Sequence, residues 1–347
     1  MKHSRNGRRD GLSQDPMGRG TWTRRSFLCA ALLAASLLPA QAAPRGEKLR
    51  AVVTVPDLGD LVRVIGGDQV EIHTICRGKE NLHYVSPRPS DLIALSRADL
   101  FCQLGLSAEA TWLPSLINRA RNPKISSGAS GFVNVSEGWE AIQVPAVLSR
   151  SLGDVHPQGN PHFNLHPLAG RHMARQVCAG LVRVDGAHQA EYEQRLQAYE
   201  KLLDRAEARW AAVGARFRGK RVVEYHQEFN YLEQYYGIVL DGALEPKPGT
   251  PPTPKHLAEL VGLMRAEGTN VILTAAWSNN SFVEDVAKKA DAKAVELPNM
   301  VEEKGTWVAM MDEIHLRLAR AFGVEADELK QPPEEESGES HAREQTR

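Results

Sequence analysis

The sequence has little cysteine, no long apolar run and almost no net charge. Only four of its 347 residues are cysteine, and no two form a Cys-x-x-Cys pair, which argues against a metal site built from thiolates. Beyond its first 42 residues, no stretch approaches the ~20 apolar residues that a membrane-spanning helix needs. What remains is a globular chain whose length is typical of two domains.

The first 42 residues are interpreted as an export signal. Arg24-Arg25 precedes an apolar run from Cys29 to Leu38, and small residues follow it up to Ala42. This order predicts a twin-arginine signal cleaved near Ala42. An ordinary export signal that happens to hold two arginines is the alternative, and both deliver the protein to the periplasm.

Cleavage would leave a soluble and mildly acidic mature chain. The segment 1–42 holds seven basic and two acidic residues, so its removal changes the formal charge from −1 to −6. Scattered charges of this sign argue against nucleic acid as a partner. Either Met1 or Met17 is the natural start, and the mature chain is the same in both cases.

Three cysteines remain after cleavage: Cys76, Cys102 and Cys178. Cys76 ends one predicted strand and Cys102 lies in the next. Because an exported protein is in an oxidising compartment, we expect these two to form a disulfide and Cys178 to be buried in a helix.

Short β-rich runs alternate with helical stretches along the chain. In the first half we expect strands at 49–55, 70–76, 100–104 and 132–135, with helices at 58–65, 91–98 and 112–121. In the second half we expect strands at 221–225, 238–240, 271–274 and 292–297, with helices at 229–236, 254–266, 282–289 and 307–322. Such alternation predicts an α/β fold with two parallel-sheet lobes.

A long amphipathic helix is predicted between the two lobes. Apolar residues recur every three or four positions from Tyr192 to Phe217. At ~1.5 Å per residue this helix is roughly 40 Å long, enough to act as a rigid backbone joining two lobes. The predicted organisation is therefore a signal peptide at 1–42, an N-terminal lobe at 43–186, the linking helix at 187–218, a C-terminal lobe at 219–325 and a disordered tail at 326–347.

Three histidines lie in predicted loops or just after strands, where parallel α/β folds usually carry their chemistry. His83 comes after the second strand, His162 before the long helix, and His226 directly after the run 222–225. Taken singly, each is more often a structural residue than a ligand. They are 79 and 64 residues apart, so they can meet only in a cleft between the lobes.

The residues around these histidines resemble a known family. The segments that carry the resemblance are His83-Tyr84 with Pro87, 89–92 (Pro-Ser-Asp-Leu) and 97–100 (Arg-Ala-Asp-Leu); 160–167 (Asn-Pro-His-Phe-Asn-Leu-His-Pro); 225–229 with 235–237; and 245–249 with 252–254. They are similar to the segments of the zinc and manganese solute-binding proteins of ABC importers, over a region from about Leu49 to Phe322.

This resemblance implies a periplasmic receptor, not an enzyme, that captures a divalent metal through His83, His162 and His226. It would deliver the metal to an inner-membrane ABC permease and act as a monomer. Neutral imidazole suits zinc, copper and nickel, whereas manganese prefers oxygen ligands. We therefore expect Zn²⁺ as the cargo, ahead of Mn²⁺, Cu²⁺ or Ni²⁺.

The chain departs from the family pattern where acidic ligands are common. His166 stands in place of an aspartate, Ala275-Ala276 in place of a glutamate, and the run 296–298 reads Glu-Leu-Pro rather than Leu-Asp-Pro. The fourth ligand therefore stays open between Glu296, Glu228 and water.

Some further residues are candidates for supporting roles. His156 is close enough in sequence to His162 to be an auxiliary ligand, and Glu224 shares a predicted strand face with His226, whose ring it could orient. Trp277, Asn279 and Asn280 are candidates for lining the cleft. Packed or solvated roles are expected for His73, His172, His188, His256 and His315.

Two other functions fit the same residues. A zinc hydrolase would also use three histidines and an open position, with Glu228 as the general base, although no His-Glu-x-x-His motif accompanies it. A metal-binding adhesin or chaperone on the same fold is the other alternative.

Overall fold

The computed structural model describes residues 47–146, 156–247 and 249–329. The predicted export signal at 1–42 and residues 330–347 of the predicted tail lie outside this part of the chain. Ordered structure continues past residue 326, through a 3₁₀ turn at Asp327–Leu329 whose last side chain is buried.

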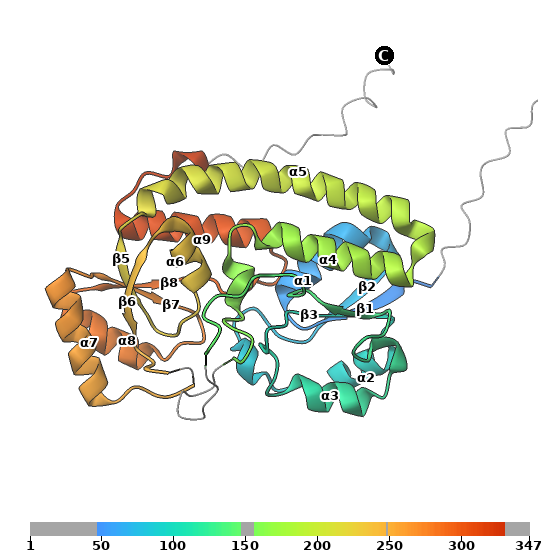
Figure 1. The fold of residues 1–347 in the computed structure, drawn as a ribbon, viewed down its shortest axis with the longest axis horizontal. Coiled ribbons are helices and arrows are strands. Elements are labelled where there is room, and N and C mark those ends of the chain that lie inside the picture. Colours follow the sequence, from blue (N-terminus) through green and yellow to red (C-terminus); the bar gives the residue numbers. More distant parts are fainter. Residues whose placement is uncertain (1–46, 147–155, 248, 330–347) are drawn as a thin grey trace, which may run out of the picture. The chain divides into compact units, whose positions relative to one another are not determined.

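The first lobe is a parallel four-stranded sheet with the strand order β2-β1-β3-β4. Its strands are β1 (Leu49–Val53), β2 (Val70–Thr74), β3 (Leu100–Gln103) and β4 (Phe132–Asn134). Its helices are α1 (Pro56–Gly66), α2 (Pro89–Arg97), α3 (Leu113–Ala120) and α4 (Ala169–Val184). Figure 1 shows α1 and α4 on one face of the sheet and α2 and α3 on the other.

The second lobe repeats this plan with the strand order β6-β5-β7-β8. Its strands are β5 (Arg221–Glu224), β6 (Val239–Ala243), β7 (Val271–Thr274) and β8 (Lys293–Glu296), all parallel. Its helices are α6 (Asn230–Tyr236), α7 (Pro254–Glu267), α8 (Asn280–Ala290) and α9 (Trp307–Phe322). The prediction of two parallel-sheet α/β lobes is confirmed.

The long helix α5 (Gln189–Gly214) packs against both lobes. It contacts α1 and α4 of the first lobe and α9 of the second, and Figure 1 shows it lying across both. Its 26 residues correspond to about 39 Å at 1.5 Å per residue. The 3₁₀ turns Gly186–His188 and Ala215–Phe217 take up the ends of the range in which one unbroken helix was expected.

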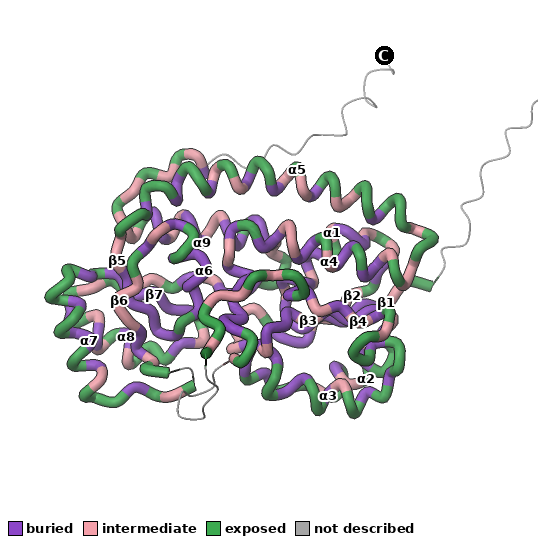
Figure 2. The backbone as a smooth tube through the Cα atoms, viewed as in Figure 1, coloured by how far each residue is buried: buried purple, intermediate pink, exposed green. Residues whose placement is uncertain are grey.

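The hydrophobic core is continuous beneath α5 and crosses from lobe to lobe. Trp210 of α5 packs edge to face on Trp307 of α9, with ring centroids 5.7 Å apart. A smaller cluster fills the space between the second sheet and α7 and α8. Val222 belongs to the first cluster and Val223 to the second, because neighbouring strand residues point to opposite faces. Figure 2 shows buried residues in the inner strands β1, β3, β5 and β7 and along the helices α1 and α9.

Buried polar contacts also join the two lobes. The Asp57 carboxylate of α1 accepts hydrogen bonds from the Asn164 amide (3.0 Å) and from the backbone N–H of Val301 (3.1 Å). Asp60, one turn further on, accepts from the backbone N–H of Trp307 (2.7 Å) at the start of α9. Burial raises the pKa of Asp57 to about 6. These bonds hold the two lobes in one relative position.

The predicted disulfide is wrong, because Cys76, Cys102 and Cys178 are all free and buried. The N–H of Thr54 donates to the carbonyl of Cys102, and the carbonyl of Thr54 accepts from the N–H of Cys76, so Thr54 lies between the two cysteines. Two strand spacings are about 9–10 Å. A disulfide requires Cα atoms within about 7 Å. The burial of Cys178 in α4 is as expected.

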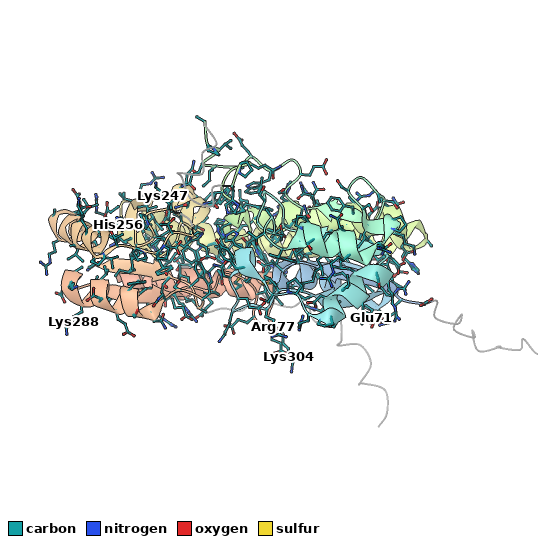
Figure 3. The ribbon with its side chains drawn as sticks, turned by 90° about the horizontal axis from the view of Figure 1, so that it is seen from below. Glu71, Arg77, Lys247, His256, Lys288 and Lys304 are labelled. Carbon is teal, nitrogen blue, oxygen red and sulfur yellow. The ribbon has the colours of Figure 1, made fainter. Side chains whose placement is uncertain are left out.

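None of the described helices is long and apolar enough to cross a membrane. Exposed charged side chains of both signs occur on both lobes, for example Glu71 on the first and Lys288 on the second (Figure 3). Within the described residues, this distribution agrees with the scattered charge of the sequence.

The close contact between α5 and α6 predicts that Gly214→Ala destabilises the fold. A Cβ atom at Gly214 would lie 2.0 Å from the Tyr236 ring. That ring cannot swing away freely, because its hydroxyl is hydrogen-bonded to His315 Nε2 at 2.6 Å. We expect overpacking to lower the free energy of unfolding by about 1–3 kcal/mol, measured by urea denaturation.

The matched control is Gly262→Ala in the middle of α7, where a Cβ would meet no atom within 4 Å. We expect it to raise the free energy of unfolding by about 0.5–1 kcal/mol, because alanine restricts the unfolded chain and favours a helix. Equal effects of the two substitutions would show that the α5–α6 contact is not tight.

Candidate metal centre

His83 and His162 are both placed by an asparagine two residues earlier. The Asn81 side chain accepts a hydrogen bond from the N–H of His83, and the Asn160 side chain accepts one from the N–H of His162, each at 2.9 Å. Asparagine forms such local turns readily, because its short side chain reaches the backbone two residues on. Each histidine then lies on a 3₁₀ turn, Leu82–Tyr84 or His162–Leu165.

His226 lies two residues beyond the carboxyl end of β5. Asn160 also connects this segment to His162, because its amide nitrogen donates to the carbonyl of Gln227 (3.1 Å) and to the Asn230 side chain (3.0 Å). One asparagine thus links the loops that carry two of the three histidines.

The structure brings His83, His162 and His226 together. Each offers one ring nitrogen, and these three atoms lie within 4.8 Å of one another. The Nε2 atoms of His83 and His162 are 3.1 Å apart. All three side chains are buried, with exposed fractions of 6%, 2% and 7%. Among the described residues this is the one group of three or more histidine, cysteine or acidic side chains that could hold a metal ion.

The Nδ1 atom of each ring faces an oxygen. His83 Nδ1 is 3.0 Å from the carbonyl oxygen of Ala108, and His226 Nδ1 is 2.8 Å from Glu245 Oε2. His162 Nδ1 lies 3.8 Å from Glu228 Oε1. The first two contacts are hydrogen bonds, and such acceptors fix the ring orientation of metal-bound histidines and leave the Nε2 lone pair for the ion.

The electrostatic surroundings keep two of the rings neutral. Burial, together with the neighbouring histidines, lowers the pKa of His83 to about 3 and lowers that of His162 well below its usual value. A metal ion binds the neutral form of imidazole. At neutral pH these two rings therefore need to lose no proton before they bind an ion.

The carboxylates considered from the sequence take other roles. Glu224 is not the partner of His226: its carboxylate accepts from the N–H of Phe229 (2.9 Å), and Glu245 orients His226 instead. Glu228 Oε1 accepts from the Asn299 side chain (2.7 Å), and burial raises its pKa. Glu296 is exposed at the end of β8. None of these carboxylates belongs to the group of three nitrogens.

Of three further histidines, one lies beside the centre and two lie away from it. His156 lies beside the centre, with its ring centroid 4.7 Å from that of His83. His166 is turned away from it, because its Nδ1 accepts from the N–H of Leu168 (3.0 Å) and its ring packs on Trp139. His315 is fully buried and hydrogen-bonded to Tyr236, as its predicted packed role requires.

Two hollows open onto the centre. The first is lined by Asn81, His83, Tyr84, Ser107, Ala108, Ala110, Thr111, His156, Pro157, His226, Glu245, Gly249 and Trp277, and the second by Gln143, His156, Gly159, Asn160, Pro161, His162, His226 and Gln227. Trp277 lines the first hollow as expected. Asn279 instead caps α8, where its side chain accepts from the N–H of Ser281 (3.1 Å).

The fold and the centre together define a class of protein. Two doubly wound lobes, joined by a long helix, place a three-histidine cluster between loops of the first and second sheets. This is the architecture of a two-lobed metal-binding protein, with its site beyond the carboxyl ends of parallel strands.

The chain belongs to the family described as ZnuA, zinc-uptake complex component A, periplasmic, whose profile matches residues 51–321. It is thus a member of the metal-binding family of ABC transporter substrate-binding proteins.

Relatives of the chain are named for three different metals. It is 23% identical over 270 residues to the iron ABC transporter substrate-binding lipoprotein MtsA of Streptococcus pyogenes serotype M1, covering 76% of this chain and 83% of that protein. It is 25% identical over 244 residues to the manganese ABC transporter substrate-binding lipoprotein PsaA of Streptococcus anginosus, covering 69% and 76%. It is 23% identical over 280 residues to the high-affinity zinc uptake system protein ZnuA of Bacillus subtilis (strain 168), covering 80% and 86%.

A solved structure has the same fold. The crystal structure of a ZnuA protein superposes with a TM-score of 0.67 at 19% sequence identity, covering 79% of this chain and 99% of that one. This agreement supports the two-lobed arrangement with its long connecting helix.

The bond between Glu245 and His226 predicts that Glu245→Ala weakens metal binding. Without this acceptor, His226 loses its fixed orientation, and we expect affinity for Zn²⁺ to fall tenfold to a hundredfold in a competition titration with a chromophoric chelator. Glu296→Ala is the control and should bind as the unchanged protein does. A loss in the Glu296 variant with none in the Glu245 variant would reverse the two assignments.

Proposed function

We propose that this protein captures Zn²⁺ through the Nε2 atoms of His83, His162 and His226 and delivers it to an ABC importer. The observation that carries the proposal is the convergence of three nitrogen donors from separate loops, with no carboxylate among them. Borderline nitrogen donors suit Zn²⁺, whereas Mn²⁺ is better served by carboxylate oxygens. The donor set thus favours zinc among the three metals for which relatives are named.

We also propose a location and a partner for this receptor. The export signal proposed at 1–42 and the family description both support a periplasmic location. The permease of an inner-membrane ABC importer is the proposed partner, and the receptor is proposed to act as a monomer. Delivery to that permease separates this function from that of an adhesin or a chaperone, and co-purification with importer-containing membranes tests it.

A hydrolytic function is less well supported by the surroundings of Glu228. A general base must reach a metal-bound water and accept its proton. Glu228 Oε1 instead accepts a hydrogen bond from Asn299 and lies 3.5 Å from the indole nitrogen of Trp277. Both contacts engage Oε1, the Glu228 oxygen that faces His162.

The direct test is titration of the chelator-stripped protein with Zn²⁺. Replacement of His83, His162 and His226 by alanine should lower affinity at least a thousandfold, which corresponds to about 4 kcal/mol. The matched control replaces His73, His188 and His256, which lie outside the centre and are paired with Asp91, Asp185 and a backbone carbonyl. Retention of full affinity by the first variant would refute the site.

The packing of α5 on both lobes predicts little closure when metal binds. A helix that contacts α1, α4 and α9 together resists hinge motion between the lobes. Small-angle X-ray scattering with and without Zn²⁺ should therefore give the same radius of gyration within error. A clear compaction would contradict this expectation.

A further inference from the structure

The three clustered nitrogens leave one position of a tetrahedral zinc site to be supplied. The nearby carboxylates are already engaged. Glu245 holds His226 Nδ1, and Glu228 accepts from Asn299. Each of these carboxylates thus uses one oxygen to fix a neighbouring side chain. Among the described residues, His156 is a further nitrogen donor beside the centre.

His156 lies where the two hollows meet. It lines both of them, and among the described residues His226 does so as well. Its ring lies against His83, with an angle of 32° between the ring planes. A positive charge on His156 would lower the pKa values of both His83 and His162, which reflects its closeness to both.

The ring separations of the three clustered histidines fit imidazoles around one ion. With Zn–N bonds of about 2.1 Å, tetrahedral geometry places the centroids of bound imidazole rings about 5 Å apart. The observed centroid distances are 5.0 Å for His83 and His162, 5.4 Å for His162 and His226, and 5.8 Å for His83 and His226. The distance of 4.7 Å between His83 and His156 belongs to the same range.

The nitrogens of His156 are not among the three that lie within 4.8 Å of one another. Its ring must therefore rotate to reach the ion. The side chain is partly exposed at the edge of both hollows, whereas His83, His162 and His226 are buried. The two hollows that it lines give the ring room to rotate between staggered rotamers.

We propose that the imidazole of His156 turns onto the captured ion as its fourth ligand and covers it from solvent. This step rests on the proposed function and adds a specificity-determining residue to it. An all-nitrogen centre favours zinc, copper or nickel over manganese, because Mn²⁺ prefers carboxylate and water oxygens. His156 would thus supply a nitrogen where the family pattern often has a carboxylate.

The first test compares two metals in the full chain. We expect His156→Ala to weaken Zn²⁺ binding tenfold to a hundredfold while changing Mn²⁺ binding less than threefold, so that selectivity for Zn²⁺ falls. The matched control, His188→Ala, should leave both affinities unchanged. Equal weakening of both metals by His156→Ala would show a structural role and overturn the proposal.

The second test detects the ligand directly. In His156→Cys, kept reduced and loaded with Co²⁺, a thiolate at this position should bind the ion and give a sulfur-to-cobalt charge-transfer band in the near ultraviolet. The unchanged protein should lack this band, because Cys76, Cys102 and Cys178 are buried away from the centre. Binding of Co²⁺ by the variant without the band would overturn the proposal. Failure of the unchanged protein to bind Zn²⁺ or Co²⁺ at all would instead refute the proposed function.

Discussion

Three imidazoles from both lobes can meet at one point only if the lobes are held in a fixed relation, and buried hydrogen bonds provide that relation. Asn164 donates to Asp57 of α1 and to the carbonyl of Asn299 in the second lobe, so one side chain links the two halves. Asn299 in turn donates to Glu228, which faces His162. The polar contacts between the lobes thus continue into the metal centre. A shift of one lobe would break several of these bonds together. Each buried polar group left unpaired would then cost about 1–3 kcal/mol.

The sequence predicted most elements, because the signals that define them are local. The strand at 271–274 and the helix at 307–322 have the predicted bounds. In the helix, the side chain of Thr306 caps the first turn and Gly323 adopts the left-handed conformation that ends it. The three histidines were found because each lies in a segment that resembles the family. The distances between these histidines depend on how the two lobes pack, which no local sequence pattern predicts.

The predictions that the structure contradicts depended on which strands lie side by side in a sheet. The expected disulfide assumed that strands consecutive in sequence are adjacent, but β1 lies between β2 and β3. Glu224 was expected to orient His226 because alternate strand residues share a face, yet β5 ends at Glu224 and His226 lies beyond it. Glu245 follows β6, which pairs with β5, so the carboxyl ends of the two strands bring it to His226. Its position in sequence gave no sign of this contact, since strand order is set by how the crossover helices pack.

The helix α5 has a consequence for the way cargo would leave. In receptors whose lobes swing apart, opening breaks all contacts on one side of the ligand at once. Here the lobes share a core beneath α5, so release of the ion would depend on movement of the loops that carry the histidines rather than on separation of the lobes. The time for which the ion stays bound would then depend on local movement of the residues that line the two hollows.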